Sequence, residues 1–149
     1  MKICLACSHG GHFTETMQIL DAFQGHEIFI ATYHSAREQE VKRVARAYFT
    51  ENMGASLWNM LKGSLWALGI LWSERPQIIV SLGAEIAIPF FYFGRLMGAK
   101  TLFIESWCRV ESLSLTGKLV YPAANAFWVQ WPQLLQVCGG KAEFHGAVI

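Results

Sequence analysis

The stretch that decides the fold is "KICLACSHGGHFTE", residues 2–15. Its first half, Lys2 to Cys7, is a short apolar run, which is typical of a buried strand. Two glycines, Gly10 and Gly11, interrupt the chain between two histidines. From Thr14 to Phe23, apolar residues recur with the spacing of one helical face. The stretch therefore predicts a strand that ends in a glycine turn and leads into a helix.

The same order of a strand followed by a helix recurs along the rest of the chain. We expect strands over 27–32, 47–50, 77–82, 100–105 and 127–130, and an extended segment over 143–149. Helices are expected over 56–72 and 86–97, with short helical segments after 116 and 131 and a surface helix or loop over 36–47. Continuous apolar strands alternating with helices predict an α/β fold, a doubly wound, mostly parallel, Rossmann-like sheet. We expect one domain over residues 1–149.

The composition narrows the function classes. Hydrophobic residues make up 53% and charged residues 15%, so we expect some apolar surface to face a partner or a membrane. The net charge of +1 gives no support for nucleic-acid binding. Asp21 is the single aspartate, which excludes an Asp-x-Asp metal site for a sugar nucleotide. No apolar run reaches the roughly 18 residues of a membrane span, and we expect no signal peptide and free thiols in a reducing cytosol.

The glycine turn itself admits several interpretations. Cys4, Cys7, His9 and His12 have the residue types of a zinc site, but strand residues three apart point to opposite faces, so two buried cysteines are the simpler interpretation. The turn also lacks the G-x-G-x-x-G pattern of dinucleotide sites. Backbone N–H groups at the helix start suit a pyrophosphate, and the imidazole of His12 suits proton transfer near neutral pH. A plain glycine turn with a helix-capping histidine remains the alternative.

Two further stretches carry a family resemblance. "SLGAEIAIPFFYFGRLMGAKTLFIESWCRVESLSLTGKLVYP" (81–122) and "FWVQWPQLL" (127–135), together with "SHGGHFTE" (8–15), resemble the acceptor-side subunit of split glycosyltransferases, the family of the asparagine-linked glycosylation protein numbered fourteen. The resemblance implies the N-terminal half of a metal-independent GT-B glycosyltransferase that needs no cofactor. A second protein would bind the nucleotide sugar, and the acceptor would be a lipid-pyrophosphate-linked sugar.

The resemblance also implies where the protein works. Eukaryotic members carry an N-terminal membrane helix that we do not find here, which favours the bacterial relatives of capsule and exopolysaccharide synthesis. We therefore expect peripheral attachment to the cytoplasmic face of a membrane and no activity without the partner. A non-catalytic membrane scaffold that activates a separate glycosyltransferase is one alternative function, and a zinc-binding module is another.

The family's functional residues map onto this chain through the quoted motifs. His12, with Glu15 nearby, is expected to be catalytic. Acceptor and pyrophosphate contacts are expected from His9, Gly10, Gly11, Gly83, Ala84, Glu85, Glu105, Arg109, Ser114, Thr116 and Gly117. An ion pair between Glu105 and Arg109 that orders the loop is the alternative to ligand contact there. The "VQWP" motif is expected to be a packing and turn element.

The segment from 56 to 72 is the candidate membrane surface. It carries Trp58, Trp66 and Trp72, and tryptophan favours the boundary between membrane and water. One stripe, formed by Trp58, Leu61, Leu65, Leu68 and Trp72, is wholly apolar. We expect part of this helix, with Phe90, Phe91 and Phe93, to lie against the bilayer. An ordinary core helix is the alternative, because such stripes usually pack inward.

Overall fold

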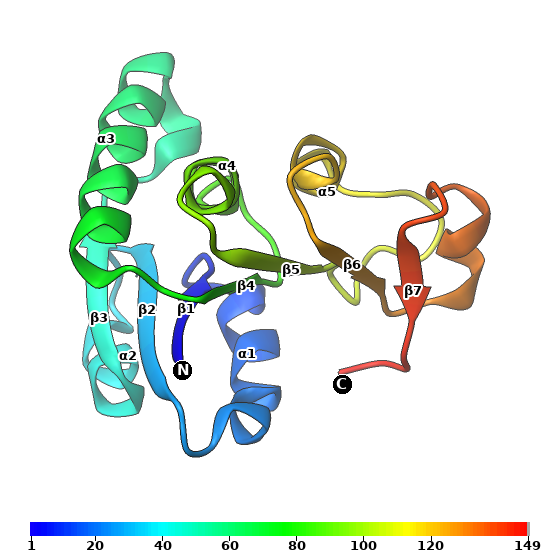
Figure 1. Cartoon of the computed structure of the whole chain (residues 1–149), viewed down its shortest axis with the longest axis horizontal. Helices are drawn as coiled ribbons and strands as arrows, with labels where there is room; N and C mark the ends of the chain where they lie inside the picture. The colour runs from blue at the N-terminus through cyan, green and yellow to red at the C-terminus, as the bar shows by residue number, and fades with distance from the viewer. Residues whose placement is uncertain (149) are drawn as a thin grey trace.

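Seven strands form one sheet in the computed structural model, which describes residues 1–148 and, of Ala55, only the backbone (Figure 1). The strands lie in the order β3-β2-β1-β4-β5-β6-β7, and every pair of neighbours is parallel. Their bounds are β1 Lys2–Ala6, β2 Glu27–Tyr33, β3 Arg46–Thr50, β4 Ile78–Ser81, β5 Lys100–Ile104, β6 Ala126–Val129 and β7 Ala142–Phe144. The predicted doubly wound, parallel α/β fold is therefore confirmed.

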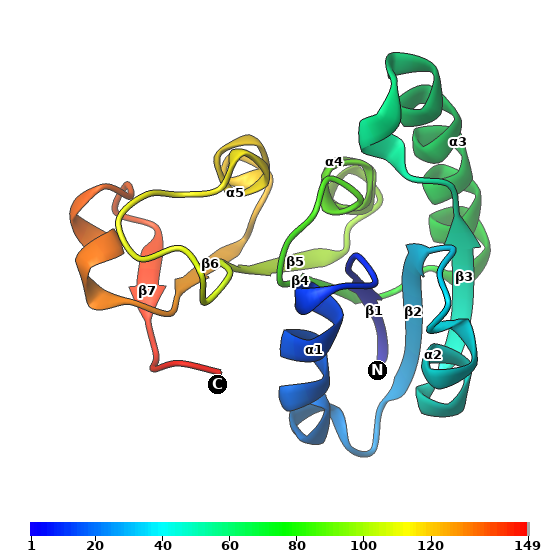
Figure 2. The same ribbon diagram turned by 180° about the vertical axis from the view of Figure 1, so that it is seen from behind.

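Helices cover the sheet on both faces (Figures 1 and 2). One face carries α1 (Gly11–Gln18) and α2 (Glu38–Val44), and the other carries α3 (Leu57–Glu74), α4 (Ala87–Leu96) and α5 (Leu115–Val120). Three short 3-10 turns, η1 (Leu20–Phe23), η2 (Met53–Ala55) and η3 (Pro132–Gln136), complete the elements. Ser56 and Ser114 cap α3 and α5, since each hydroxyl accepts a hydrogen bond from the backbone N–H three residues later.

Two predicted segments differ from the structure. The helix expected over 14–23 begins three residues earlier, at Gly11, and ends at Gln18, after which the chain continues as η1. Glycine is a poor helix former, so the sequence did not indicate that the helix begins at Gly11. Gly10 is the residue before the helix and has the non-helical angles φ −92° and ψ −131°. The terminal extended segment is a strand only over Ala142–Phe144, and its predicted last residue, Ile149, lies outside the described residues.

Each face of the sheet has its own apolar core. Cys4 belongs to the core under α3, α4 and α5, whereas Cys7 belongs to the core under α1 and α2. The two cysteines therefore lie on opposite faces of β1 and its extension, as the strand interpretation predicts. Phe90 and Phe91 are fully buried in the first core. The expectation that these two phenylalanines touch a bilayer is wrong, because α4 turns them towards the sheet.

One charged cluster ties α3 to the far edge of the sheet. Glu74, at the end of α3, accepts hydrogen bonds from Lys2 Nζ at 3.0 Å, from Arg46 Nη2 at 2.8 Å and from the Tyr48 hydroxyl. Burial alone would raise the pKa of this carboxyl, but the hydrogen bonds from Tyr48 and Lys2 and the nearby positive charges outweigh it and hold the pKa below its ordinary value. The carboxylate is thus ionised in the folded chain.

Candidate functional site

The strand order reverses between β1 and β4, and ligands of open α/β sheets bind outside the carboxyl ends of the strands at such a point. The turn after β1 and the turn after β4 meet there. A Cβ atom built on Gly83 would lie only 2.5 Å from Cε1 of His12, so the imidazole packs directly on the Gly83 backbone. Gly83 has φ +135°, a conformation that side chains rarely adopt. The structure thus brings two sequence-predicted turns together.

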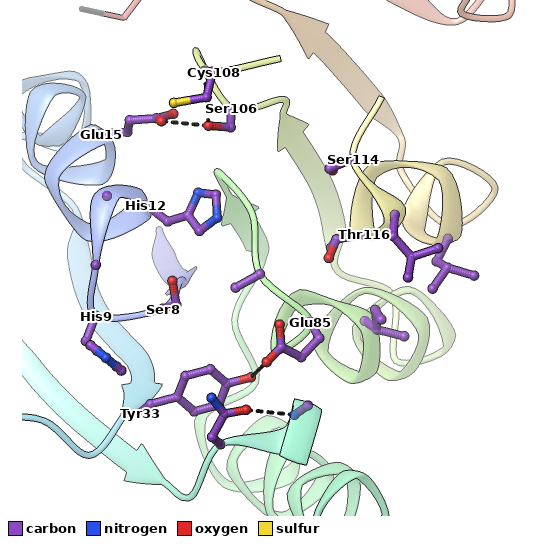
Figure 3. Close-up of a pocket in the computed structure, with 18 of the residues that line it drawn as sticks. Ser8, His9, His12, Glu15, Tyr33, Glu85, Ser106, Cys108, Ser114 and Thr116 are labelled. Atoms are coloured by element: carbon purple, nitrogen blue, oxygen red, sulfur yellow. Dashed lines mark hydrogen bonds between the residues drawn. The ribbon is translucent and has the colours of Figure 1, made fainter. Parts of the chain in front are cut away.

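A pocket of about 870 Å³ opens at this junction (Figure 3). Ten of the predicted site residues line it, namely His9, Gly10, Gly11, His12, Glu15, Ala84, Glu85, Arg109, Ser114 and Thr116. Gly83, Glu105 and Gly117 lie behind the lining, where they hold other residues in place. The predicted residues therefore gather at one site, although they come from four separate segments of the chain.

The two histidines of the first turn are short of hydrogen bonds. Nδ1 of His9 and Nδ1 of His12 are buried and have no partner among the described residues. The ring of His9 lies edge-on to that of Tyr33, with 6.3 Å between the ring centres. A buried polar atom without a partner costs roughly 1–3 kcal/mol. Both rings line the pocket, and each keeps a buried nitrogen without a partner among the described residues.

The glycines between the histidines keep the start of α1 free of side chains. Neither Gly10 nor Gly11 has a positive φ, and a Cβ on either would meet nothing within 4 Å. The chain nevertheless bends at His9 and Gly10, as the glycine turn predicts, and Gly10 has φ −92° and ψ −131°. The two glycines leave the start of α1 uncovered, where no acidic residue sits in the first turn and where helix N–H groups face outward. This surface suits an anion.

Glu15 is almost completely buried, with 4% of its surface exposed, and it joins three elements. Its carboxylate accepts hydrogen bonds from the Ser106 hydroxyl at 2.8 Å, from the Trp107 N–H at 3.3 Å and from Gln130 Nε2 at 3.2 Å. Gln130 also donates to the Glu105 carbonyl at 3.0 Å. The glutamine of "VQWP" is thus more than a packing element, and the Glu15 carboxylate is occupied in holding the loop after β5.

Glu105 closes the two ends of that loop. Its fully buried carboxylate accepts hydrogen bonds from the Ser106 N–H and from both the N–H and the hydroxyl of Ser114, all at 3.0 Å. A Cβ on Gly117 would lie 2.2 Å from Glu105 Oε2, so a side chain there would displace the carboxylate. Among the described residues Glu105 forms no ion pair with Arg109, whose exposed side chain is free at the pocket rim.

Several lining residues escaped the sequence analysis. The Tyr33 hydroxyl donates to Glu85 Oε1 at 3.1 Å, and Asn52 follows β3 beside them. Burial and the Glu85 carboxylate raise the pKa of Tyr33 far above its ordinary value, so the hydroxyl stays protonated. An apolar wall comes from α3, α4 and α5 and consists of Met60, Ile88, Leu115 and Leu119. Tyr33 ends β2 and Asn52 follows β3, so the rule that carboxyl ends of parallel strands converge was the available signal.

The outer surface of α3, α4 and α5 is unusually apolar. Trp58 and Trp72 are 63% and 67% exposed, whereas Trp66 is partly buried and packs edge-on against Phe90 with 5.8 Å between ring centres. Trp66 therefore offers less surface to a membrane than Trp58 and Trp72 do. We call the exposed set the apolar helix face, which comprises Leu57, Trp58, Leu61, Leu65, Leu68, Trp72, Tyr92, Leu96, Met97, Leu115 and Leu119. Within residues 1–148, no helix combines the length and hydropathy needed to cross a bilayer.

The zinc interpretation finds no support in the geometry. Across residues 1–148, no three His, Cys, Asp or Glu side chains are grouped so that they could hold a metal ion. Cys4 and Cys7 are buried on opposite sides of the sheet. The four residues of the pattern at the first turn therefore do not converge.

Comparison with known proteins places the chain in a family. The family described as "Oligosaccharide biosynthesis protein Alg14 like" matches residues 35–148. A Schizosaccharomyces pombe relative named UDP-N-acetylglucosamine transferase subunit alg14 is 44% identical over 170 residues, covering 93% of this chain and 79% of the relative. Relatives from Yarrowia lipolytica and Homo sapiens, with the same printed name, are 32% and 30% identical. The matches span 41% and 36% of those two proteins, so this chain corresponds to less than half of either.

Solved structures agree on the fold. MurG from Acinetobacter baumannii superposes with a TM-score of 0.79 at 15% identity, over 97% of this chain and 45% of MurG. The galactosyltransferase WaaB of the lipopolysaccharide outer core gives a TM-score of 0.69 at 12% identity, over 96% of this chain and 44% of WaaB. The fold is thus that of the N-terminal half of a GT-B glycosyltransferase, as predicted. Together with the family match and the motifs at the pocket, this shows that the chain belongs to the Alg14-like family of oligosaccharide biosynthesis proteins.

Proposed function

We propose that this chain is the acceptor-binding subunit of a two-protein glycosyltransferase. The reaction would move a sugar from a UDP-sugar to a lipid-pyrophosphate-linked sugar, in polysaccharide or lipid-linked oligosaccharide synthesis. The observation that carries the proposal is the pocket at the β1–β4 junction, where an unpartnered imidazole, open helix N–H groups and an apolar wall lie together. The names of the relatives support a UDP-N-acetylglucosamine donor and a partner subunit.

In this mechanism His12 is the general base. The hydroxyl oxygen of the acceptor sugar forms a bond to the anomeric carbon of the donor, and His12 takes the hydroxyl proton. The bond from that carbon to the diphosphate oxygen breaks, and UDP leaves with the electron pair. No metal ion takes part in this scheme, in keeping with Asp21 as the one aspartate, which lies in η1 and outside the pocket. Glu15, with its three hydrogen bonds, positions the Ser106 loop and transfers no proton.

The acceptor pyrophosphate would bind the N–H groups of Gly11 and His12 and the Arg109 guanidinium. Gly11→Ala tests this contact. Alanine is the better helix former and meets nothing at this position, so the variant should be as stable as wild type or more stable by about 0.5–1 kcal/mol. Binding of a water-soluble, short-chain prenyl pyrophosphate, measured by calorimetry, should nevertheless weaken. Gly69→Ala, an open and exposed position in α3, is the matched control and should leave binding unchanged.

The catalytic role requires the assembled enzyme. With the donor-binding partner present, His12→Ala should lower turnover by about 10²-fold or more, while the pair still assembles. The lone chain should transfer no sugar, because it supplies one wall of a cleft that a second subunit completes. Normal turnover by the His12→Ala pair would favour a non-catalytic scaffold over a catalytic subunit. Turnover by the lone chain would contradict the two-protein design.

The apolar helix face would rest on the cytoplasmic leaflet and bring the pocket to the lipid acceptor. Its three helices carry cations at Lys62, Arg95 and Lys118, and their one acid, Glu74, is buried. Apolar side chains beside cations suit an anionic bilayer surface. Leu115 and Leu119 belong both to this face and to the pocket wall, which would give the lipid chain a continuous apolar path.

Vesicle co-sedimentation tests the membrane surface. Trp58→Glu combined with Trp72→Glu removes two exposed side chains of the apolar helix face and should reduce binding to vesicles that contain an anionic lipid. Val44→Glu combined with Leu135→Glu changes two exposed apolar residues outside that face and is the matched control. Equal sedimentation of the two double variants would show that this face does not meet the membrane.

A further inference from the structure

Glu85 is the one pocket-lining carboxylate that keeps most of its hydrogen-bonding capacity free. Its carboxylate has a single donor among the described residues, the Tyr33 hydroxyl at 3.1 Å, and it enters no ion pair there. Glu15, the other lining carboxylate, accepts three hydrogen bonds. An ionised carboxyl has about four acceptor sites. Glu85 is therefore open to donors from a ligand.

The position of Glu85 depends on a strained backbone before it and on a closely packed glycine beside it. Gly83 and Ala84, which precede it, both have positive φ, at +135° and +72°. For alanine this conformation is strained, and strained backbone of this kind gathers at functional sites. On the opposite wall, a Cβ on Gly54 would lie 2.9 Å from Glu85 Oε1, so the glycine leaves the room that the carboxylate fills. The position of the carboxylate is thus built from three separate segments.

Charge decides which part of the acceptor Glu85 faces. A carboxylate repels a pyrophosphate, whereas the N–H groups of α1 and the Arg109 guanidinium attract it. In Figure 3, Glu85 and Tyr33 lie on one side of His12, and Ser106 and Cys108, which adjoin Arg109, lie on the other. Of the acceptor and pyrophosphate contacts expected for this set of residues, the charges favour an acceptor contact for Glu85. Hydroxyl and amide N–H groups are the donors that suit a free carboxylate.

The reacting sugar lies within reach of this carboxylate. A hydroxyl that gives its proton to His12 must touch the imidazole, and the imidazole packs on Gly83, two residues before Glu85. We infer that Glu85, oriented by Tyr33, hydrogen-bonds the hydroxyl or acetamido groups of the acceptor sugar and selects a neutral sugar over a uronic acid. This inference rests on the proposed acceptor site and adds the class of sugar that the site takes.

Calorimetry with three water-soluble probes tests it on the full chain: citronellyl pyrophosphate, N-acetylglucosaminyl pyrophosphoryl citronellol, and the counterpart of the latter with a 6-carboxylate. For wild type we expect the neutral sugar probe to bind most tightly. Glu85→Gln should weaken the binding of that probe about 10- to 100-fold, since a hydrogen bond to a charged group is lost. It should leave citronellyl pyrophosphate unchanged or tighter, and it should improve binding of the carboxylate probe. Tyr33→Phe should weaken only the neutral sugar probe.

The probes separate the possible failures. Glu111→Gln, at an exposed position of the loop after β5, controls for a general change of charge and should alter nothing. Improved binding of the carboxylate probe cannot come from a misfolded variant. Equal weakening of all three probes by Glu85→Gln, or no effect on any, would overturn the inference and leave the acceptor site standing. Failure of wild type to bind any probe would overturn the acceptor site, and the inference with it.

Discussion

Replacing Gly83 by alanine should break the contact on which the site is built. The new methyl group would lie 2.5 Å from Cε1, 2.7 Å from Nδ1 and 2.9 Å from Nε2 of His12, so the whole ring must move. The positive φ of +135° adds backbone strain of about 1–3 kcal/mol. Overpacking against the partly buried His12 ring adds about 1–3 kcal/mol more. We therefore expect Gly83→Ala to lower the free energy of unfolding by about 2–6 kcal/mol.

A matched glycine separates the two contributions. Gly98 also has a positive φ, +90°, but a Cβ there would meet nothing within 4 Å. Gly98→Ala should therefore show the strain alone, about 1–3 kcal/mol. Both variants are measured by urea unfolding of the full chain. The excess loss in Gly83→Ala estimates the steric contact with His12.

A double-mutant cycle tests whether the cost of Gly83→Ala comes from contact with the His12 ring. In a His12→Ala background the ring is absent, so Gly83→Ala should cost no more than Gly98→Ala does. The coupling energy between positions 12 and 83 should then be about 1–3 kcal/mol, within the range known for residues in contact. Additive losses would show that the ring does not rest on Gly83, and the placement of the proposed base beside the loop of Glu85 would fail with it.

Three further outcomes test other parts of the structure. Folding lowers the pKa of Glu74, so the ionised carboxylate stabilises the fold fully above its ordinary pKa, and this stabilisation is lost as the pH falls through the pKa of the folded state. The difference in unfolding free energy between wild type and Glu74→Gln, measured in urea, should therefore shrink between about pH 6 and pH 3. A constant difference would contradict this. Gly117→Ala should push Glu105 from its place and release the loop after β5, seen as faster tryptic cleavage after Arg109; unchanged cleavage would count against the clamp. A thiol reagent should label exposed Cys108 in the native chain, whereas Cys7, whose pKa burial raises to about 12, should react only on unfolding; similar native rates would refute its burial.

Local sequence was sufficient for most of the sheet. The apolar runs that became β1, β4 and β5 were predicted within one residue at each end, because a strand buried on both faces needs nearly every side chain to be apolar. The start of α1 was missed because the two glycines conceal it. The bounds of β7 were predicted poorly for another reason, because an edge strand of three residues is too short to show a periodic pattern of apolar residues.

The orientation of α3 could not be predicted from periodicity. Apolar residues surround this helix, and the stripe of Trp58, Leu61, Leu65, Leu68 and Trp72 is the exposed one. Inward contacts come instead from smaller or later positions such as Gly63, Ala67 and Ile70. A Cβ on Gly63 would lie 2.5 Å from Met53 Cε, so close packing of η2 selects the inward face. That contact depends on tertiary structure and leaves no periodic trace.

The candidate site divides into groups that the fold satisfies and groups that it leaves open. Glu15 and Glu105 are buried carboxylates with three hydrogen bonds each, and they join α1, the loop after β5 and the start of α5. His12 and Glu85 lie at the same junction, yet the first has a buried nitrogen without a described partner and the second has one donor. A saturated buried group contributes chiefly to stability, because removing it strands its partners. An unsatisfied group costs stability in the free protein and regains it when a ligand supplies the partner. Variants of Glu15 and Glu105 should therefore lower stability and binding together, whereas conservative variants of His12 and Glu85 should change binding or turnover without a loss of stability.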